Sequence, residues 1–312
     1  MKYKIEDYEF SPRLKQKTKV PIPESLYRYF SINTNNIEAL EKFSLWASQP
    51  DQFNDLFDSS EVKLTTSTLS PNKYRALFDK YIEHDFESPE YISEFKDHIY
   101  FYYLNRLGII CTTTTMTNEL LWAHYSNNNG FALEIDYMNL PPNFQDPVEM
   151  NYAKNLDEFT NFKNNDPFQT IFLNSLIKKD IWSYEDEFRI FVSPRNNSNT
   201  KIFENPVGFY RNNKETIQKQ SRLFRVNKSI FKSIALGFHF FTNHITKSDF
   251  DRIDIRFDTS DEQSDLKRRV LEFGVKNKIP FFNTAISKVT FELDSYPIKI
   301  KKINSNLFHI YK

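Results

Sequence analysis

The stretch Lys179–Val192, which reads KDIWSYEDEFRIFV, places two aromatic residues and a run of acids at the start of an alternating segment. From Glu187 onward, Glu187, Arg189 and Phe191 fall on one side, and three apolar residues fall on the other. A period of two is typical of a β-strand, whose successive side chains point to opposite faces. The stretch therefore predicts a strand that presents the Glu187 carboxylate at its end, beside any cavity there.

Glu185 and Glu187 are two residues apart, and this spacing points both carboxylates the same way. Close like charges can raise the pKa of one carboxyl group, which general acid and base catalysis uses. The alternative is an edge strand with solvated charges, because clusters of charge also occur without a function.

Composition excludes several classes of protein. The chain has 312 residues, with 41 basic and 41 acidic side chains, so its net charge gives no sign of a nucleic-acid or membrane partner, although a local basic patch remains compatible with it. The 31 Phe and 17 Tyr predict an aromatic-rich core. Five Gly leave no glycine-rich phosphate loop, which argues against Rossmann dehydrogenases, P-loop enzymes and protein kinases.

The chain holds one cysteine, Cys111, in an apolar run, so no disulfide can form within it. This suits a reducing cytoplasm, and we expect a buried strand cysteine rather than a nucleophile. The N-terminal residues 1–19 are charged and lack the apolar core of a signal peptide. No run approaches the roughly 18–20 apolar residues of a membrane span. We therefore predict a cytoplasmic protein without a membrane partner.

The pattern of elements predicts an α+β fold, because strands and helices mix without regular βα alternation. We expect a lead-in segment at 1–24 and a single α+β domain at 25–312 with a helical insertion near 71–106. Strands are predicted at 25–30, 45–48, 107–114, 130–137, 148–152, 187–192, 233–238, 253–257, 288–293 and 307–311. Helices are predicted at 36–43, 71–106, 117–126 with Thr117 as N-cap, 156–180 and 261–277.

Four clusters combine aromatic residues with a polar or charged partner, which suits a site that grips a flat ring and an anion. They lie at 27–29, 53–58, 122–125 and 182–189. Tyr and Trp can stack on a base or nicotinamide, Arg28 can clamp a phosphate, and His124 can donate to a ribose or carboxamide. The structural alternatives are a salt-bridged Arg28, a core Trp122, and turn-capping roles for Asp55 and Asp58.

A metal site is the second chemical reading. Asp55, Asp58, His124, Glu185 and Glu187 would suit Mg²⁺ or Mn²⁺ and a nuclease-like reaction. No H-E-x-x-H or H-x-H spacing is present, so we assign no metal ligand. The absence of a G-x-S-x-G elbow argues against a serine hydrolase.

Several motifs in order resemble the bacterial domain of unknown function family 2971, over about residues 25–240. They are 27–30, 45–50 leading into 53–58, 121–126 with 130–131, and 179–189. Where such families carry Pro after Asn-Asp, this chain has Leu56. The family name supplies no activity.

The order of these elements is also similar to ADP-ribosyltransferase folds, which implies a mixed, mostly antiparallel split sheet flanked by helices. The resemblance implies that Arg28 binds NAD, Ser48 supports the first strand and Tyr125 stacks on nicotinamide. It also implies a catalytic Glu187, with Glu185 assisting activation of the acceptor. This chain departs from the family pattern in that the middle Ser-Thr-Ser element is not clearly present. A carboxylate near the anomeric carbon stabilises charge that appears only in the transition state. The full expected set is Glu187, Glu185 and His124 for catalysis, and Arg28, Tyr29, Ser48, Asn54, Trp122, Tyr125 and Arg189 for NAD.

We therefore expect an NAD-dependent ADP-ribosyltransferase-like enzyme, an intracellular toxin or phage-defence effector, with a protein or nucleic acid as acceptor. The alternatives are a metal-dependent nuclease or hydrolase, and a non-enzymatic binding module. Glu187→Gln is expected to abolish NAD turnover and to leave thermal stability nearly unchanged.

Overall fold

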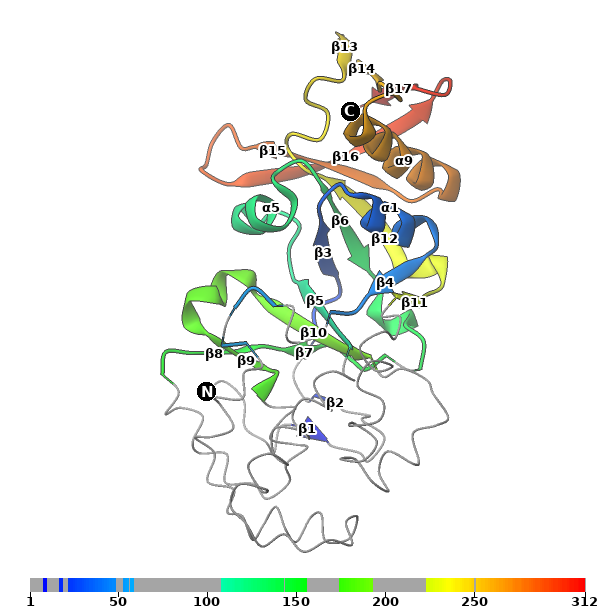
Figure 1. Ribbon diagram of the computed structural model, residues 1–312. Helices are drawn as coiled ribbons and strands as arrows, with labels where there is room; N and C mark the ends of the chain where they lie inside the picture. Colours follow the sequence, from blue (N-terminus) through cyan, green and yellow to red (C-terminus); the bar gives the residue numbers. More distant parts are fainter. Residues whose placement is uncertain are drawn as a thin grey trace, which may run out of the picture.

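The computed structural model describes residues 22–48, 53–55, 57–58, 108–142, 144–155, 174–192, 223–249 and 251–311, and the backbone of two short strands near the N-terminus. This part of the chain is α+β, with a large, mostly antiparallel sheet and a few helices (Figure 1). The expected fold class is confirmed at this level.

The main sheet has eleven strands. Among them, β12 and β15 run parallel, and the other neighbours are antiparallel. In spatial order they are β13 (Ile245–Ser248), β14 (Arg252–Arg256), β17 (Leu307–Tyr311), β16 (Leu293–Lys302), β15 (Phe281–Ile286), β12 (Phe231–Leu236), β6 (Phe131–Ile135), β3 (Leu26–Phe30), β5 (Gly108–Thr113), β10 (Glu187–Val192) and β7 (Val148–Glu149).

Smaller pieces flank this sheet. The described α-helices are α1 (Thr34–Glu41), α5 (Glu119–Ser126) and α9 (Glu262–Asn277). The 3₁₀-helices are η3 (Tyr137–Asn139), η5 (Asp180–Glu185) and η7 (Lys228–Ile230). Three two-stranded sheets pair β1 (Tyr8–Glu9) with β2 (Lys17–Thr18), β4 (Ser44–Trp46) with β11 (Leu223–Arg225), and β8 (Asn151–Ala153) with β9 (Ile177–Lys179). No described helix has the length and apolar character needed to cross a bilayer.

The sheet opens between β3 and β5. β3 pairs with β6 along its whole length, and β5 pairs with β10 along its whole length. Between the described strands β3 and β5, however, the register holds at one pair, Tyr27 with Thr113. At the other end of β5, Ile109 forms an isolated bridge with Ser48 instead. The strands therefore diverge, and the space between them becomes the candidate site.

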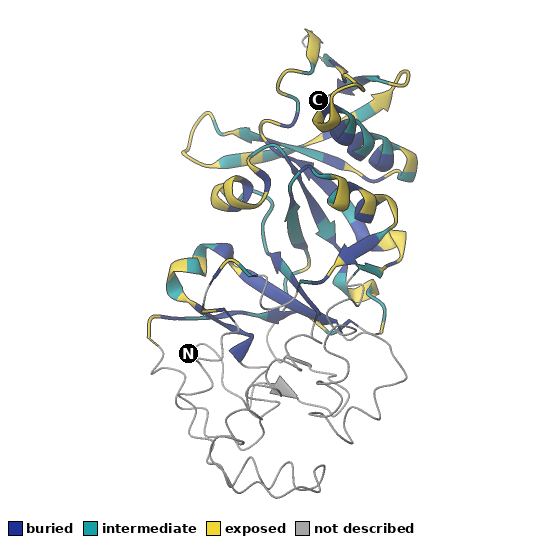
Figure 2. Ribbon diagram, in the orientation of Figure 1, coloured by how far each residue is buried: buried dark blue, intermediate teal, exposed yellow. Residues whose placement is uncertain are grey.

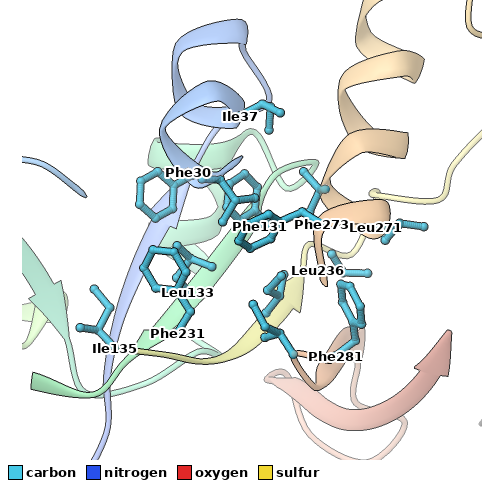
Figure 3. Close-up of a cluster of buried hydrophobic side chains, with 14 of the residues drawn as sticks. Phe30, Ile37, Phe131, Leu133, Ile135, Phe231, Leu236, Leu271, Phe273 and Phe281 are labelled. Atoms are coloured by element: carbon cyan, nitrogen blue, oxygen red, sulfur yellow. The ribbon is translucent and has the colours of Figure 1, made fainter. Parts of the chain in front are cut away.

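One face of the sheet carries the main hydrophobic core, under α1 and α9. Side chains from β3, β6, β12 and β15 meet side chains from these two helices (Figure 3). Phe30 stacks on Phe131 with ring centroids 5.1 Å apart, and Phe273 of α9 packs into the same cluster. Burial of these large rings, together with the aliphatic side chains around them, stabilises the packing of the helices on the sheet.

The opposite face is covered by α5, which follows a tight connection. Asn118 caps the helix by accepting from the Leu121 N–H, so the expected cap at Thr117 lies one residue too early. After the helix, Asn127 and Asn128 adopt φ values of 51° and 57°, a conformation that Asn tolerates better than most residues. The chain thus makes its left-handed turn with Asn.

Gly130 follows this turn, and a Cβ there would lie 1.9 Å from the Phe30 carbonyl oxygen. Only glycine therefore fits where the chain enters β6 beside β3.

Three sequence predictions need correction. Within the predicted helix 156–180, residues 177–179 form strand β9, because a short apolar run does not distinguish a helix from a strand. The strand predicted at 288–293 is largely the turn of a hairpin whose strands are β15 and β16. The strand predicted at 45–48 ends at Trp46. The predicted insertion at 71–106 lies outside the described residues.

The core makes a stability prediction. Phe131→Ala removes a fully buried ring and should lower the free energy of unfolding by about 3–5 kcal/mol. Phe291→Ala is the matched control, since Phe291 is fully exposed and its loss should change stability by less than about 0.5 kcal/mol. Urea denaturation followed by tryptophan fluorescence measures both, and equal losses would contradict the assigned core.

Candidate functional site

A cavity of about 280 Å³ lies where β3 and β5 diverge. Its walls come from β3, β5, β9, β10, α5, η5, Ser48 and the segment around 53–54. They include tyrosines, three basic groups and two carboxylates. Such a mixture of aromatic surface and charge is typical of a small-molecule site.

Eight of the ten residues predicted for the site line this cavity. They are Arg28, Tyr29, Ser48, Asn54, Tyr125, Glu185, Glu187 and Arg189. They come from four separate stretches of the sequence, so the fold brings the predicted clusters together.

The other two predicted residues lie elsewhere. Trp122 is fully buried against Ala132 and Ala235, and its Nε1–H donates to the Met116 carbonyl at 2.8 Å. It is therefore a core residue, as the structural alternative proposed. His124 is exposed on α5 beside Tyr184, with ring centroids 6.2 Å apart, and it does not line the cavity.

Arg189 is buried at the centre of the site, with no exposed surface. Its Nε donates to Glu187 Oε1 at 2.7 Å, and its Nη1 donates to Asp58 Oδ1 at 2.9 Å and to the Ser175 carbonyl at 2.5 Å. Its Nη2 donates to Asp58 and Glu187. All five N–H groups are therefore engaged by the protein. Arg189 holds the site together and has no donor left for NAD.

Phe53 covers the same guanidinium group, because the Arg189 Cζ lies 4.7 Å from the Phe53 ring centroid. Asp58 and Phe53 thereby fix their segment against β10. Asp55 turns this segment by accepting the Phe57 N–H at 2.9 Å. Of the two predicted capping aspartates, Asp55 caps a turn and Asp58 pairs with Arg189.

Lys178 on β9 is the second buried cation, and the sequence did not single it out. Its Nζ lies 2.5 Å from Glu185 Oε2, 3.2 Å from Glu187 Oε2 and 4.0 Å from Asp58 Oδ2. The sequence feature that could have identified Lys178 is its position directly before the stretch Lys179–Val192. Burial lowers its pKa, but the nearby glutamates outweigh burial and raise it, so Lys178 stays charged.

Glu187 is ionised in this setting. Burial alone would raise its pKa, but Arg189 and Lys178 outweigh burial and lower the pKa to about 2. The alternative of an edge strand with solvated charges is wrong for Glu187. Both faces of β10 are buried. Burial also raises the pKa of the Cys111 thiol, and Glu187 raises it further, so Cys111 is not activated as a nucleophile.

Glu185 differs from Glu187 although the two are neighbours. Burial, and then the Glu187 charge, raise its pKa, while Lys178 opposes this shift. Tyr125 donates its hydroxyl to Glu185 Oε1 at 2.7 Å, and Asn54 donates to the same hydroxyl at 3.5 Å. The predicted splitting of the two carboxyl pKa values is thus present, and Glu185 is the more basic of the pair.

Arg28 has the most freedom among the three cations. Its Nη1 donates to the Trp46 carbonyl at 2.5 Å, and its Cζ lies 5.3 Å from the Phe30 ring centroid. No described carboxylate lies within ion-pair distance of it, so the salt-bridge alternative finds no partner in that part of the chain. Burial lowers its pKa from the usual arginine value, but an arginine remains charged at neutral pH.

The acids do not gather as metal ligands do. Asp58, Glu185 and Glu187 surround Lys178, and within the described ranges no group of three or more His, Cys, Asp or Glu side chains is placed to hold a metal ion. Lys178 and Arg189 already form ion pairs with these three carboxylates.

Comparison with known proteins finds no match to a family model, to a curated protein or to a solved structure.

Lys178 should be essential to the stability of the site. Lys178→Met leaves three buried carboxylates with one cation fewer, and the expected loss is about 3–5 kcal/mol of unfolding free energy. Lys179→Met is the matched control, because Lys179 is the exposed neighbour and its loss should cost less than about 0.5 kcal/mol. Similar losses in urea denaturation would show that the network contributes little.

The difference in unfolding free energy between wild type and Glu187→Gln should depend on pH. A folded pKa of about 2 against the usual 4.5 corresponds to about 3 kcal/mol. Because the folded pKa is depressed, this stability is present above pH 4.5 and is lost as the pH falls towards 2. The gap between wild type and Glu187→Gln should therefore narrow over that range. This replaces the expectation of unchanged thermal stability, and a gap independent of pH would contradict the assigned ionisation.

Proposed function

We propose that the cavity binds NAD as a substrate and that the protein is an ADP-ribosyltransferase-like enzyme. The observation that carries the proposal is the convergence of Arg28, Tyr125, Glu185 and Glu187, from separate segments, on one cavity where the sheet divides. A cavity of about 280 Å³ is near the lower limit of ligand pockets, so it suits the nicotinamide ribose half of NAD.

The charged and aromatic groups of the cavity match the groups of NAD. Among the described residues only the Trp46 carbonyl accepts from Arg28, which leaves N–H donors for a phosphate, and tyrosines line the cavity for a flat ring. Glu187 is ionised within the cavity wall. A fixed carboxylate in a site that excludes water stabilises positive charge better than one in bulk solvent.

The proposed reaction breaks the bond between nicotinamide nitrogen and ribose C1, and the bonding electrons leave with nicotinamide. Glu187 stabilises the oxocarbenium-like transition state. The acceptor then bonds to C1, and its proton passes to Glu185, whose raised pKa suits a base. The ion pairs of Lys178 and Arg189 hold the two carboxylates in place.

We extend the proposal to the setting that the motifs suggest. The chain would be a bacterial member of the domain of unknown function family 2971, acting in the cytoplasm as a toxin or phage-defence effector. Its acceptor would be a protein or a nucleic acid. The aromatic and charged clusters at 27–30, 53–58 and 179–189 support this proposal by meeting at one cavity.

The test is release of nicotinamide from NAD, measured by chromatography. Wild type should release nicotinamide, and Glu187→Gln should reduce the rate at least about 100-fold. Arg28→Met should mainly raise KM and so serves as a second variant, because it leaves the buried ion pairs intact. Glu119→Gln, on the exposed first turn of α5, should match wild type.

Thermal shifts with NAD and with Mn²⁺ accompany the assay, because a ligand that binds the folded state raises Tm. Absence of nicotinamide release and of any shift with NAD would refute the proposal. A shift with Mn²⁺ alone would favour the metal-dependent alternative.

A further inference from the structure

The far end of the main sheet has one face that no described element covers. In β14, β16 and β17, every second residue packs against α9 in the core, as Ile255, Ile298 and Phe308 do. The alternate residues are exposed or partly exposed (Figure 2). We name this surface the outer face. Its residues are Lys247, Arg252, Asp254, Arg256, Lys299, Lys301, Leu307, His309 and Tyr311.

Part of the charge on the outer face is neutralised locally. Arg252 Nε lies 2.9 Å from Asp254 Oδ1, and Lys247 Nζ lies 2.9 Å from Asp249 in the adjoining turn. His309 Nε2 lies 3.5 Å from Asp254. These pairs engage Asp254, the carboxylate of the outer face, and Asp249 beside it.

Other basic residues of the outer face have no described carboxylate as a partner. In the part of the chain that the structure describes, no carboxylate lies within ion-pair distance of three exposed basic residues, Arg256, Lys299 and Lys301. The whole chain has equal numbers of acidic and basic residues, so this excess is a local feature. An uncompensated basic surface attracts a polyanion.

Two aromatic side chains, Tyr311 and His309, lie beside Lys299 and Lys301. The strand registers place Tyr311 directly between Lys299 of β16 and Arg252 of β14, and they place His309 beside Lys301. Directly opposed residues in antiparallel strands have Cβ atoms about 5 Å apart. An aromatic ring flanked by cations on a bare antiparallel sheet offers a surface for stacking a base while its phosphates meet the lysines.

We propose that the outer face binds single-stranded nucleic acid. Tyr311 stacks on a base, and Lys299, Lys301 and Arg256 contact the phosphates. The aromatic ring among the cations favours a nucleic acid over an acidic protein, because bases and phosphates alternate along the strand as the ring and the cations alternate on the surface. The inference does not depend on NAD binding in the cavity.

Fluorescence anisotropy of the full chain tests the proposal with labelled oligo(dT) and oligo(U) of about twelve nucleotides. Lys299→Glu/Lys301→Glu should weaken binding at least about tenfold and reduce the slope of log K against log salt by about 1.4. Tyr311→Ala should weaken binding about tenfold. The two probes distinguish DNA from RNA.

The matched control is Lys228→Glu/Lys276→Glu, which makes the same change in net charge at exposed lysines away from the outer face. It should bind within about twofold of wild type. Lys299→Gln/Lys301→Gln provides a milder variant if charge reversal lowers Tm.

Failure of the wild type to bind either probe at low salt would overturn the proposal, as would equal losses in the two charge-reversal variants. Competition by polyglutamate as strong as that by oligonucleotide, with Tyr311→Ala unaffected, would overturn it in favour of an acidic protein partner. None of these outcomes depends on nicotinamide release, so a failure here is distinct from a failure of the proposed enzyme activity.

Discussion

The charge of Arg189 sits inside the protein with no exposed surface, and the geometry of the cavity depends on neutralising it. An isolated charge in the interior would cost far more than one hydrogen bond returns, so its partners must be held within reach. Glu187 on the same strand and Asp58 from a distant segment meet this need. Arg189 thereby ties β10 to a cavity wall that the chain reaches more than a hundred residues earlier. Lys178 extends the same network to Glu185.

The division of the sheet supplies the space for this network. β3 and β5 meet at Tyr27 and Thr113 and then separate, so Arg28 and Thr112, the next residues in that register, line the cavity instead of pairing with each other. Buried ion pairs and aromatic side chains are in contact in this cavity, because Tyr125 donates to Glu185 and Phe53 covers Arg189. The same sheet continues to β14, β16 and β17, whose outer face is basic where the cavity holds paired charges.

Sequence patterns predicted the parts of the fold that local physics controls. The alternation from Glu187 to Val192 gave a strand, and the run at 261–277 gave a helix that the structure places at Glu262–Asn277. The sequence prediction placed a strand at the turn between β15 and β16. This exposed turn contains Val289 and Phe291, and such apolar residues are also typical of a strand. Strand β9 was missed, because Ile177–Lys179 is too short to show a period.

The sequence by itself determined which residue types could form a site: the paired Glu185 and Glu187, Arg28, and the aromatic clusters. Only the tertiary structure decided which of these residues are buried, charged or ion-paired. Ionisation depends on burial and on neighbours distant in sequence, so Arg189 became a structural cation and Lys178 the link between the two glutamates. Trp122 entered the core because Ala132 and Ala235 leave room for it, a fact of sheet register that no local pattern contains.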